Sequence, residues 1–142
     1  MPPRRRPSTV SPRRRRTHEW VLAAVPAELR AQIDRWAEEW IKENFARGLT
    51  VRAADRGPLN YPVEVFSEWR GTAFYICARY RSRNRPPEGD FVVRSARMTL
   101  KGLGRFDLAF FRHTERWFTV FRGLTPAECF EHIEGNEMFW PI

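Results

Sequence analysis

The spacing of hydrophobic residues along this chain changes from helical to alternating at Gly48, and that change constrains the fold more than any other feature. Upstream of Gly48, apolar residues recur every three to five positions between Ala27 and Phe45. This spacing predicts an amphipathic α-helix with one buried face, which Pro26 would begin and Gly48 would end. The inward residues are Leu29, Ile33, Trp36, Trp40 and Phe45, and the outward acids are Glu28, Asp34, Glu38 and Glu39.

Downstream of Gly48, apolar and polar residues alternate, which is typical of β-strands with one buried face. Six segments follow this pattern, so we expect about six mostly antiparallel strands after the helix. The segments are 49–54, 63–69, 72–81, 91–100, 105–111 and 117–122.

A tight link at Arg70-Gly71 joins the second and third of these segments. A two-residue turn there would place Trp69 opposite Thr72. Val63 would then face Ala78, and a slip by one residue would mix the two faces of the hairpin. The predicted core face holds Val63, Val65, Trp69, Phe74, Ile76, Ala78 and Tyr80. The predicted other face holds Glu64, Phe66, Glu68, Tyr75, Cys77, Arg79 and Arg81.

Two further turns are predicted between the later strands. The three residues 113–115 would join 106–111 to 117–121 in a second hairpin, although Thr114-Glu115 lacks the glycine that a primed turn prefers. Gly102-Leu103-Gly104 is too short to cradle a phosphate group, and we interpret it as a turn.

The end of the chain predicts a short helix and a docked terminus. Thr125 and Glu128 have the spacing of a capping box, and Pro126 suits the first helical position. Phe130 and Ile133 would face inward until Gly135 ends the helix. The apolar residues 139–142 are expected to pack against the body of the domain.

A leading helix, a run of strands and a short closing helix indicate an α+β fold. The segment 105–140 contains an aromatic hairpin (106–110, then Trp117-Phe118), a short helix (124–133) and a closing Phe-Trp. In these features it resembles the C-terminal half of a small bacterial domain family of unknown function. The leading helix and strands are similar too, so the resemblance extends over 27–142. The chain departs from the family at Phe106, where members have tryptophan, and at Gly135-Asn136, where they have an acidic pair. The resemblance implies a fold and no activity.

The charge of the chain is concentrated at its N-terminus. The formal net charge is +8, and residues 1–16 hold seven arginines and no acid. The remainder has 18 basic and 17 acidic residues, so the predicted body is close to neutral. Four prolines and the absence of aromatic residues in 1–16 predict a disordered arginine-rich tail, followed by a single α+β domain over 17–142.

This tail favours a nucleic-acid partner, because clustered guanidinium groups on an extended segment can follow phosphates and release counterions. Minor-groove arms of DNA-binding proteins and arginine-rich RNA-binding segments both have such compositions, so DNA and RNA remain open. A solvated tail without a partner remains the alternative. The residues concerned are Arg4, Arg5, Arg6, Arg13, Arg14, Arg15 and Arg16.

A second basic feature is the stripe Arg79, Arg81, Arg83 and Arg85. In an extended β-strand these residues lie on one side, about 6.6 Å apart. This distance is close to the spacing of successive phosphates along one nucleic-acid strand. Tyr75 falls on the same face and could stack on a base. The alternative is a charged strand end that opposes aggregation. Arg94 and Arg97 are expected on opposite faces of their strand, so they cannot both join this stripe.

The remaining candidates for chemistry are weak. Cys129 and His132 are spaced to share a helix face, but a metal site or a nucleophile would need more partners than the sequence offers. Glu64 and Glu68 are better explained as ion-pair partners of arginines than as an acid–base pair. Three aromatic residues on the predicted outer faces could form a protein interface: Phe66, Tyr75 and Phe118.

We therefore expect a nonenzymatic, cytoplasmic protein that associates with DNA or RNA through phosphate contacts. No cofactor, metal or membrane partner is expected, since two cysteines form no zinc quartet and no stretch reaches the roughly 18 apolar residues of a membrane helix. The alternative hypothesis is a protein–protein interaction module that uses an aromatic sheet face.

Overall fold

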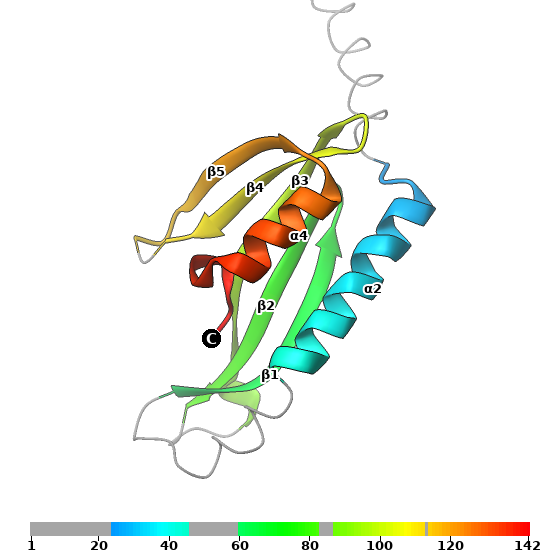
Figure 1. The fold of residues 1–142 in the computed structure, drawn as a ribbon. Helices are drawn as coiled ribbons and strands as arrows, with labels where there is room; N and C mark the ends of the chain where they lie inside the picture. The colour runs from blue at the N-terminus through cyan, green and yellow to red at the C-terminus, as the bar shows by residue number, and fades with distance from the viewer. Residues whose placement is uncertain (1–23, 46–59, 83–86, 113) are drawn as a thin grey trace, which may run out of the picture.

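The alternating segments form one antiparallel sheet, with two helices on the same side of it (Figure 1). The computed structural model describes residues 24–45, 60–82, 87–112 and 114–142. Within these ranges the α+β prediction is confirmed, with five strands rather than six. The predicted strand 49–54, the tail 1–16, Arg83 and Arg85 lie outside the described residues.

The sheet is a meander in which each strand pairs with the next, in the order β1-β2-β3-β4-β5. Consecutive antiparallel pairing needs only short links, so the fold follows from local hairpins. The strands are β1 (Asn60–Arg70), β2 (Ala73–Ser82), β3 (Phe91–Gly102), β4 (Arg105–Phe111) and β5 (Trp117–Leu124). The helices are α2 (Ala27–Asn44), α4 (Pro126–Gly135) and the 3-10 turns η2 (Pro87–Gly89) and η3 (Glu137–Phe139).

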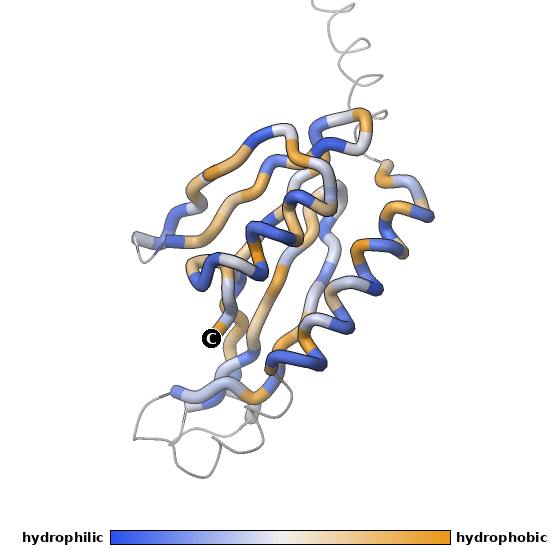
Figure 2. The backbone as a smooth tube through the Cα atoms, viewed as in Figure 1, coloured by the Kyte–Doolittle hydropathy of each residue, from blue (hydrophilic) through white to orange (hydrophobic). Residues whose placement is uncertain are grey.

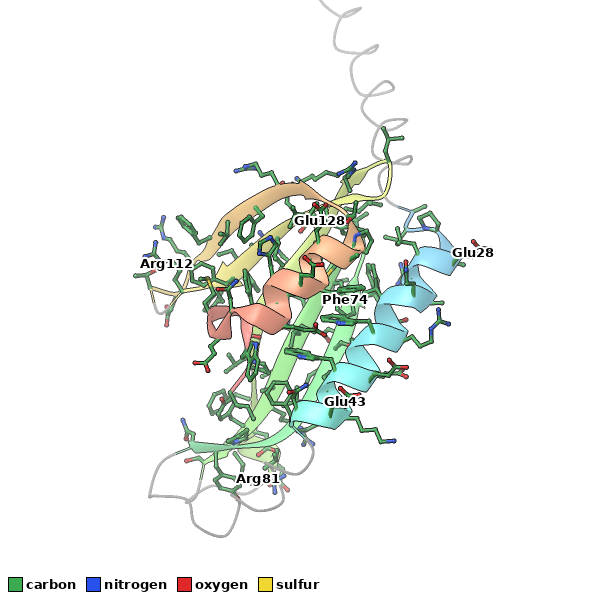
Figure 3. All side chains as sticks on the ribbon, viewed as in Figure 1. Glu28, Glu43, Phe74, Arg81, Arg112 and Glu128 are labelled. Carbon is green, nitrogen blue, oxygen red and sulfur yellow. The ribbon has the colours of Figure 1, made fainter. Side chains whose placement is uncertain are left out.

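Helix α2 confirms the predicted amphipathic pattern, because its buried residues recur at helical spacing, and hydrophilic and hydrophobic positions alternate along its coil (Figure 2). Ile33, Ala37 and Trp40 are buried, and the acids Glu28 and Glu43 project at its two ends (Figure 3). Asp34 is the exception among the predicted outward acids. It is half-buried, and its Oδ1 accepts a 2.7 Å hydrogen bond from the indole nitrogen of Trp69.

The core lies between the helices and one face of the sheet, where Phe74 sits beneath the helical layer (Figure 3). Close-packed apolar burial of this kind is the main favourable term in folding. The strand residues in this core are Val65, Phe74, Ile76, Ala78, Ala96, Met98, Leu100, Phe106 and Leu108.

The register of the first hairpin differs from the prediction by two residues. Arg70 pairs with Ala73 and Trp69 pairs with Phe74, so the turn residues are Gly71-Thr72. Gly71 has a φ of +60°, a conformation that favours glycine. Because side chains alternate with a period of two, a shift of two residues leaves the side chains from Glu64 to Arg79 on their predicted faces.

A bulge in β1 changes one predicted core residue. The regular pairing is interrupted between Pro62 and Glu64, which leaves Val63 without a partner across the hairpin. Val63 is only half-buried and stays outside the core, whereas Pro62 is buried instead. The prediction that Val63 belongs to the core is therefore wrong.

The predicted turn at 102–104 is confirmed, and β4 pairs with β5 across the predicted turn 113–115, of which residue 113 lies outside the described residues. Leu103 and Gly104 both have positive φ angles, 53° and 69°, between the paired residues Gly102 and Arg105. This geometry matches the twist of a two-residue hairpin. The β4–β5 hairpin closes with Glu115 at a φ of 64°, so a non-glycine residue adopts the left-handed conformation there.

The predicted final helix and docked terminus are also confirmed. Thr125 and Glu128 form the capping box, with the Glu128 backbone nitrogen donating to the Thr125 hydroxyl at 3.2 Å. Beyond α4, Phe139 is fully buried. The Trp140 indole donates to the Ile133 carbonyl at 2.7 Å, which ties the last residues to the helical layer. No helix in the described ranges is long and apolar enough to cross a membrane.

Candidate binding face of the sheet

The face of the sheet opposite the helices carries charged, hydroxyl and aromatic side chains; we call it the open face. Residues directly opposite in an antiparallel pair share one side of the sheet, so the register assigns them. The open face includes Glu64, Phe66, Glu68, Arg70, Ala73, Tyr75, Cys77, Arg79, Val92, Arg94, Arg97, Thr99, Lys101, Asp107, Ala109, Phe111, Trp117, Thr119 and Arg122.

A β-bulge in β3 sets the composition of this face. Ile76 pairs with Ala96, but the next residue of β2, Cys77, pairs with Arg94, which leaves Ser95 as the extra residue. Ser95 is buried, and its hydroxyl donates a 2.7 Å hydrogen bond to the carbonyl of Phe139. A bulge shifts the alternation of the strand by one position.

Because of this bulge, Arg94 and Arg97 lie on the same face, and the prediction that they fall on opposite faces is wrong. The Arg94 guanidinium carbon lies 5.8 Å from the ring centre of Tyr75. That of Arg97 lies 4.7 Å from the ring centre of Trp117. Tyr75 and Trp117 are themselves in contact, with ring centres 5.7 Å apart.

The arginines of the predicted stripe that the structure describes are paired with acids. Arg79 contacts Glu64 at 2.9 Å and Asp90 at 3.2 Å, and Arg81 contacts Asp90 at 3.0 Å. The hydrogen bond from Arg81 holds the pKa of Asp90 below its ordinary value. The sequence indicated Glu64 and Glu68 as the acids within reach of Arg79. It did not indicate Asp90, because the short 3-10 turn that brings Asp90 back to β2 has no visible signal. These two arginines therefore have part of their charge neutralised in place.

Glu68 holds a second group of arginines. It contacts Arg94 at 2.8 Å and Arg70 at 3.3 Å. Burial raises the pKa of Glu68, but hydrogen bonding and charge from Arg94, and then from Arg70, outweigh that effect and leave the pKa below its ordinary value. Glu68 is an ion-pair partner, as the sequence indicated. Cys77 lies close by and is fully buried, and that burial raises the pKa of its thiol to about 12.

A shallow hollow of about 360 Å³ lies on the open face over β2, β3, β4 and β5. Two alanines, Ala73 and Ala109, are among its lining residues and leave room that larger side chains would fill. Its charged and hydroxyl-bearing lining residues are Tyr75, Arg97, Thr99, Lys101, Asp107, Thr119 and Arg122.

The cations of this hollow differ in their partners. Arg122 contacts Asp107 at 3.4 Å, and Asp107 also accepts a 3.1 Å hydrogen bond from the backbone nitrogen of Gly123. Arg97 and Lys101 have no carboxylate partner among the described residues. The Nε atom of Arg97 is buried and has no hydrogen-bond acceptor within those ranges, which is rare in folded proteins.

The other sequence candidates do not form a site. Cys129 is fully buried, and burial raises the pKa of its thiol to about 12, while His132 stacks on Phe121 with ring centres 3.8 Å apart. The described residues contain no group of three or more His, Cys, Asp or Glu that could hold a metal ion.

The three aromatic residues predicted to share an interface do not share a face. Phe66 and Tyr75 lie on the open face. Phe118 is opposite Phe110, whose ring contacts Phe139 on the helical side.

Sequence reasoning missed most of the residues around the hollow. Arg97, Thr99 and Lys101 alternate along β3, and this period was a usable signal that they share one side. Trp117 and Arg122 come from β5, and their approach to β3 depends on the order of the strands. Three of the predicted binding residues are described by the structure, Tyr75, Arg79 and Arg81, and of these only Tyr75 lines the hollow.

A family model described as "Domain of unknown function (DUF3024)" matches residues 9–141, and the chain belongs to this family. The expected resemblance to a small family of unknown function is thus confirmed. The match includes the second arginine run, 13–16, as well as the whole sheet. Neither the curated proteins nor the solved structures contain a match to the chain.

Proposed function

We propose that this protein is a nonenzymatic nucleic-acid-associated protein that binds a phosphate backbone on its open face. The observation that carries the proposal is the pair Arg97 and Lys101. These two cations line a hollow among hydroxyl groups and have no carboxylate partner in the described part of the chain. A cation without an internal partner keeps its charge available for a phosphate oxygen.

The aromatic residues of the open face support a nucleic acid over an isolated anion. Tyr75 lines the same hollow, and Trp117 packs against both Tyr75 and Arg97. An open antiparallel sheet that presents aromatic rings beside cations can stack bases and hold phosphates together.

The arginine-rich segment 1–16 adds a long-range electrostatic contribution to this proposal. Its seven arginines supply most of the formal charge of +8. Each arginine that neutralises a phosphate releases counterions, so affinity should fall steeply with salt. Arg79 and Arg81 are expected to contribute less than the sequence suggested, because both are held by Asp90.

A protein–protein interaction module is the second candidate, favoured by one apolar end of the sheet. Phe91, Val92 and Phe111 are exposed although they are large and hydrophobic. A second hollow of about 210 Å³ has Val92, Phe111 and Trp117 among its lining residues. Exposed apolar patches beside a hollow are typical of protein contact sites.

The test is binding of the full-length protein to labelled single-stranded RNA, structured RNA and duplex DNA over a salt series. A double variant Arg97→Gln/Lys101→Gln should lower affinity by about tenfold or more. A second variant, with all seven arginines of 1–16 replaced by Gln, should flatten the salt dependence.

The matched control is Arg35→Gln/Lys42→Gln, which removes the same charge from exposed positions of α2. If this control lowers affinity as much as the open-face variant does, binding follows net charge and the open face has no special role. If the wild-type protein binds no nucleic acid at low salt, the proposal fails and the apolar end of the sheet becomes the leading site.

A further inference from the structure

We infer that the hollow of about 360 Å³ is a subsite for a phosphomonoester, namely the terminal phosphate of a single-stranded nucleic acid. This inference rests on the proposed function and makes it more specific. It specifies that Arg97 and Lys101 bind the terminal phosphate of the nucleic acid. It thereby distinguishes the end of a nucleic-acid strand from the repeated phosphodiesters along its backbone.

The charges around the hollow favour a doubly charged group. Its lining includes three cations and one carboxylate, and Asp107 is already held by Arg122 and by the Gly123 backbone. Arg97 and Lys101 therefore leave an excess of two positive charges. A phosphomonoester carries about −1.5 to −2 at neutral pH, whereas each backbone diester carries one negative charge. The monoester is the better electrostatic match.

The Arg97 side chain is held in position before any ligand arrives. Its guanidinium lies on the Trp117 ring at 4.7 Å, and its Nε is buried. A planar guanidinium fixed in this way can offer its terminal nitrogens to two oxygens of one phosphate. Because its orientation is already restricted, little side-chain entropy is lost on binding.

Hydroxyl groups complete the set of donors. Thr99 on β3, Thr119 on β5 and Tyr75 on β2 line the same hollow. A hydroxyl can donate to a phosphate oxygen, and a monoester has three terminal oxygens to accept such bonds. Arginine, lysine and hydroxyl donors from three strands thus line one hollow.

The size of the hollow suits an end nucleotide. About 360 Å³ lies near the lower end of the usual range for small-molecule sites, about 300–1,000 Å³. The small side chains of Ala73 and Ala109 leave room in the hollow, and Tyr75 is an aromatic residue of its lining. A free end can place both its phosphate and its base there, which a base inside a duplex cannot do.

The test compares three single-stranded RNA oligonucleotides of one sequence, with a 5′-phosphate, a 3′-phosphate or hydroxyls at both ends. Binding is followed by fluorescence anisotropy of an internal label, with full-length protein. We expect one phosphorylated end to bind about tenfold more tightly than the unphosphorylated strand, and the two phosphorylated strands show which end is recognised.

Arg97→Gln should abolish the preference for the phosphorylated end, and Arg97→Lys should retain part of it. Lys101→Gln is a second variant at an exposed position and should reduce the preference without affecting folding. Arg35→Gln, on the helical side, should leave the preference unchanged. Thermal unfolding of each variant confirms that it is folded.

Inorganic phosphate and a nucleoside monophosphate serve as competitors and separate the two proposals. If all three strands bind equally and Arg97→Gln weakens each of them alike, the open face binds nucleic acid but the terminal-phosphate inference is overturned. If no strand binds, yet the monophosphate stabilises the wild-type protein and not Arg97→Gln, the anion site stands and the nucleic-acid function fails.

Discussion

The two faces of the sheet use the same five strands for different purposes. The helical side is a continuous apolar cluster in which Phe74, Met98 and Phe106 are almost completely buried. The open face is built from arginine–carboxylate pairs, hydroxyls and aromatic rings. The comparison indicates that stability resides mainly on one side, which leaves the other side free to carry groups whose charge is unsatisfied.

The open face is nevertheless not a loose surface. Cys77 belongs to it and is fully buried, with Phe66 and Arg94 directly opposite it on the two neighbouring strands. Ion pairs at partly exposed positions contribute little to stability, up to about 1 kcal/mol each. Their effect here is to order arginines of the open face, among which Arg97 differs by lacking a carboxylate partner in the described residues.

The largest expected effect comes from the helical side. Phe74→Ala should destabilise the protein by about 3–5 kcal/mol, since it removes a fully buried ring and leaves a cavity. Urea unfolding measures this loss. Lys101→Gln on the open face is the matched comparison and should stay within about 0.5 kcal/mol of wild type. Similar losses for both variants would break the distinction between the two faces.

The two thiols test whether both sides of the sheet are equally closed. Burial raises the pKa of Cys77 and Cys129 to about 12, from 9.0, so the thiolate fraction falls about a thousandfold. Alkylation by iodoacetamide at pH 8 should therefore be very slow for both native thiols and rapid after unfolding in urea. Faster labelling of Cys77 than of Cys129 would show that the open face opens locally while the helical side stays closed.

The smallest effect concerns Glu68 and its dependence on pH. Its pKa in the folded protein is below the ordinary value of 4.5, so its contribution is present above that value and is lost as the pH falls through the folded pKa. Glu68→Gln should cost less than about 1 kcal/mol at neutral pH. The difference in unfolding free energy from wild type should shrink as the pH falls below 4.5 and through the folded pKa of Glu68. A difference that does not change with pH would mean that Glu68 acts through packing alone.

The sequence predicted the elements of the fold well, because each is encoded by a local signal. Thr125 and Glu128 mark the start of α4, and the spacing of Ile33 and Trp40 identifies the buried face of α2. The first hairpin was predicted two residues out of register. The local sequence does not distinguish Arg70-Gly71 from Gly71-Thr72 as the two turn residues. Its faces were still correct because the error was even.

The candidate site was much harder to predict, because it depends on irregularities that leave no local pattern. The bulges at Val63 and Ser95 each shift the alternation by one residue, and neither has a distinctive composition. Asp90 reaches Arg79 and Arg81 through a short 3-10 turn that the sequence does not indicate. Side-chain partners across four strands emerge only when the whole sheet is assembled.

Because Ser95 is an extra residue in β3, the side chains that point to the open face have even numbers before it, as Arg94 does, and odd numbers after it, as Arg97 does. Deletion of Ser95 would leave each facing pair of β2 and β3 in place. The side chains of β3 would then alternate regularly between the two faces along the whole strand. The deletion would thus remove the hydrogen bond from Ser95 to the Phe139 carbonyl without changing which side chains lie on the open face.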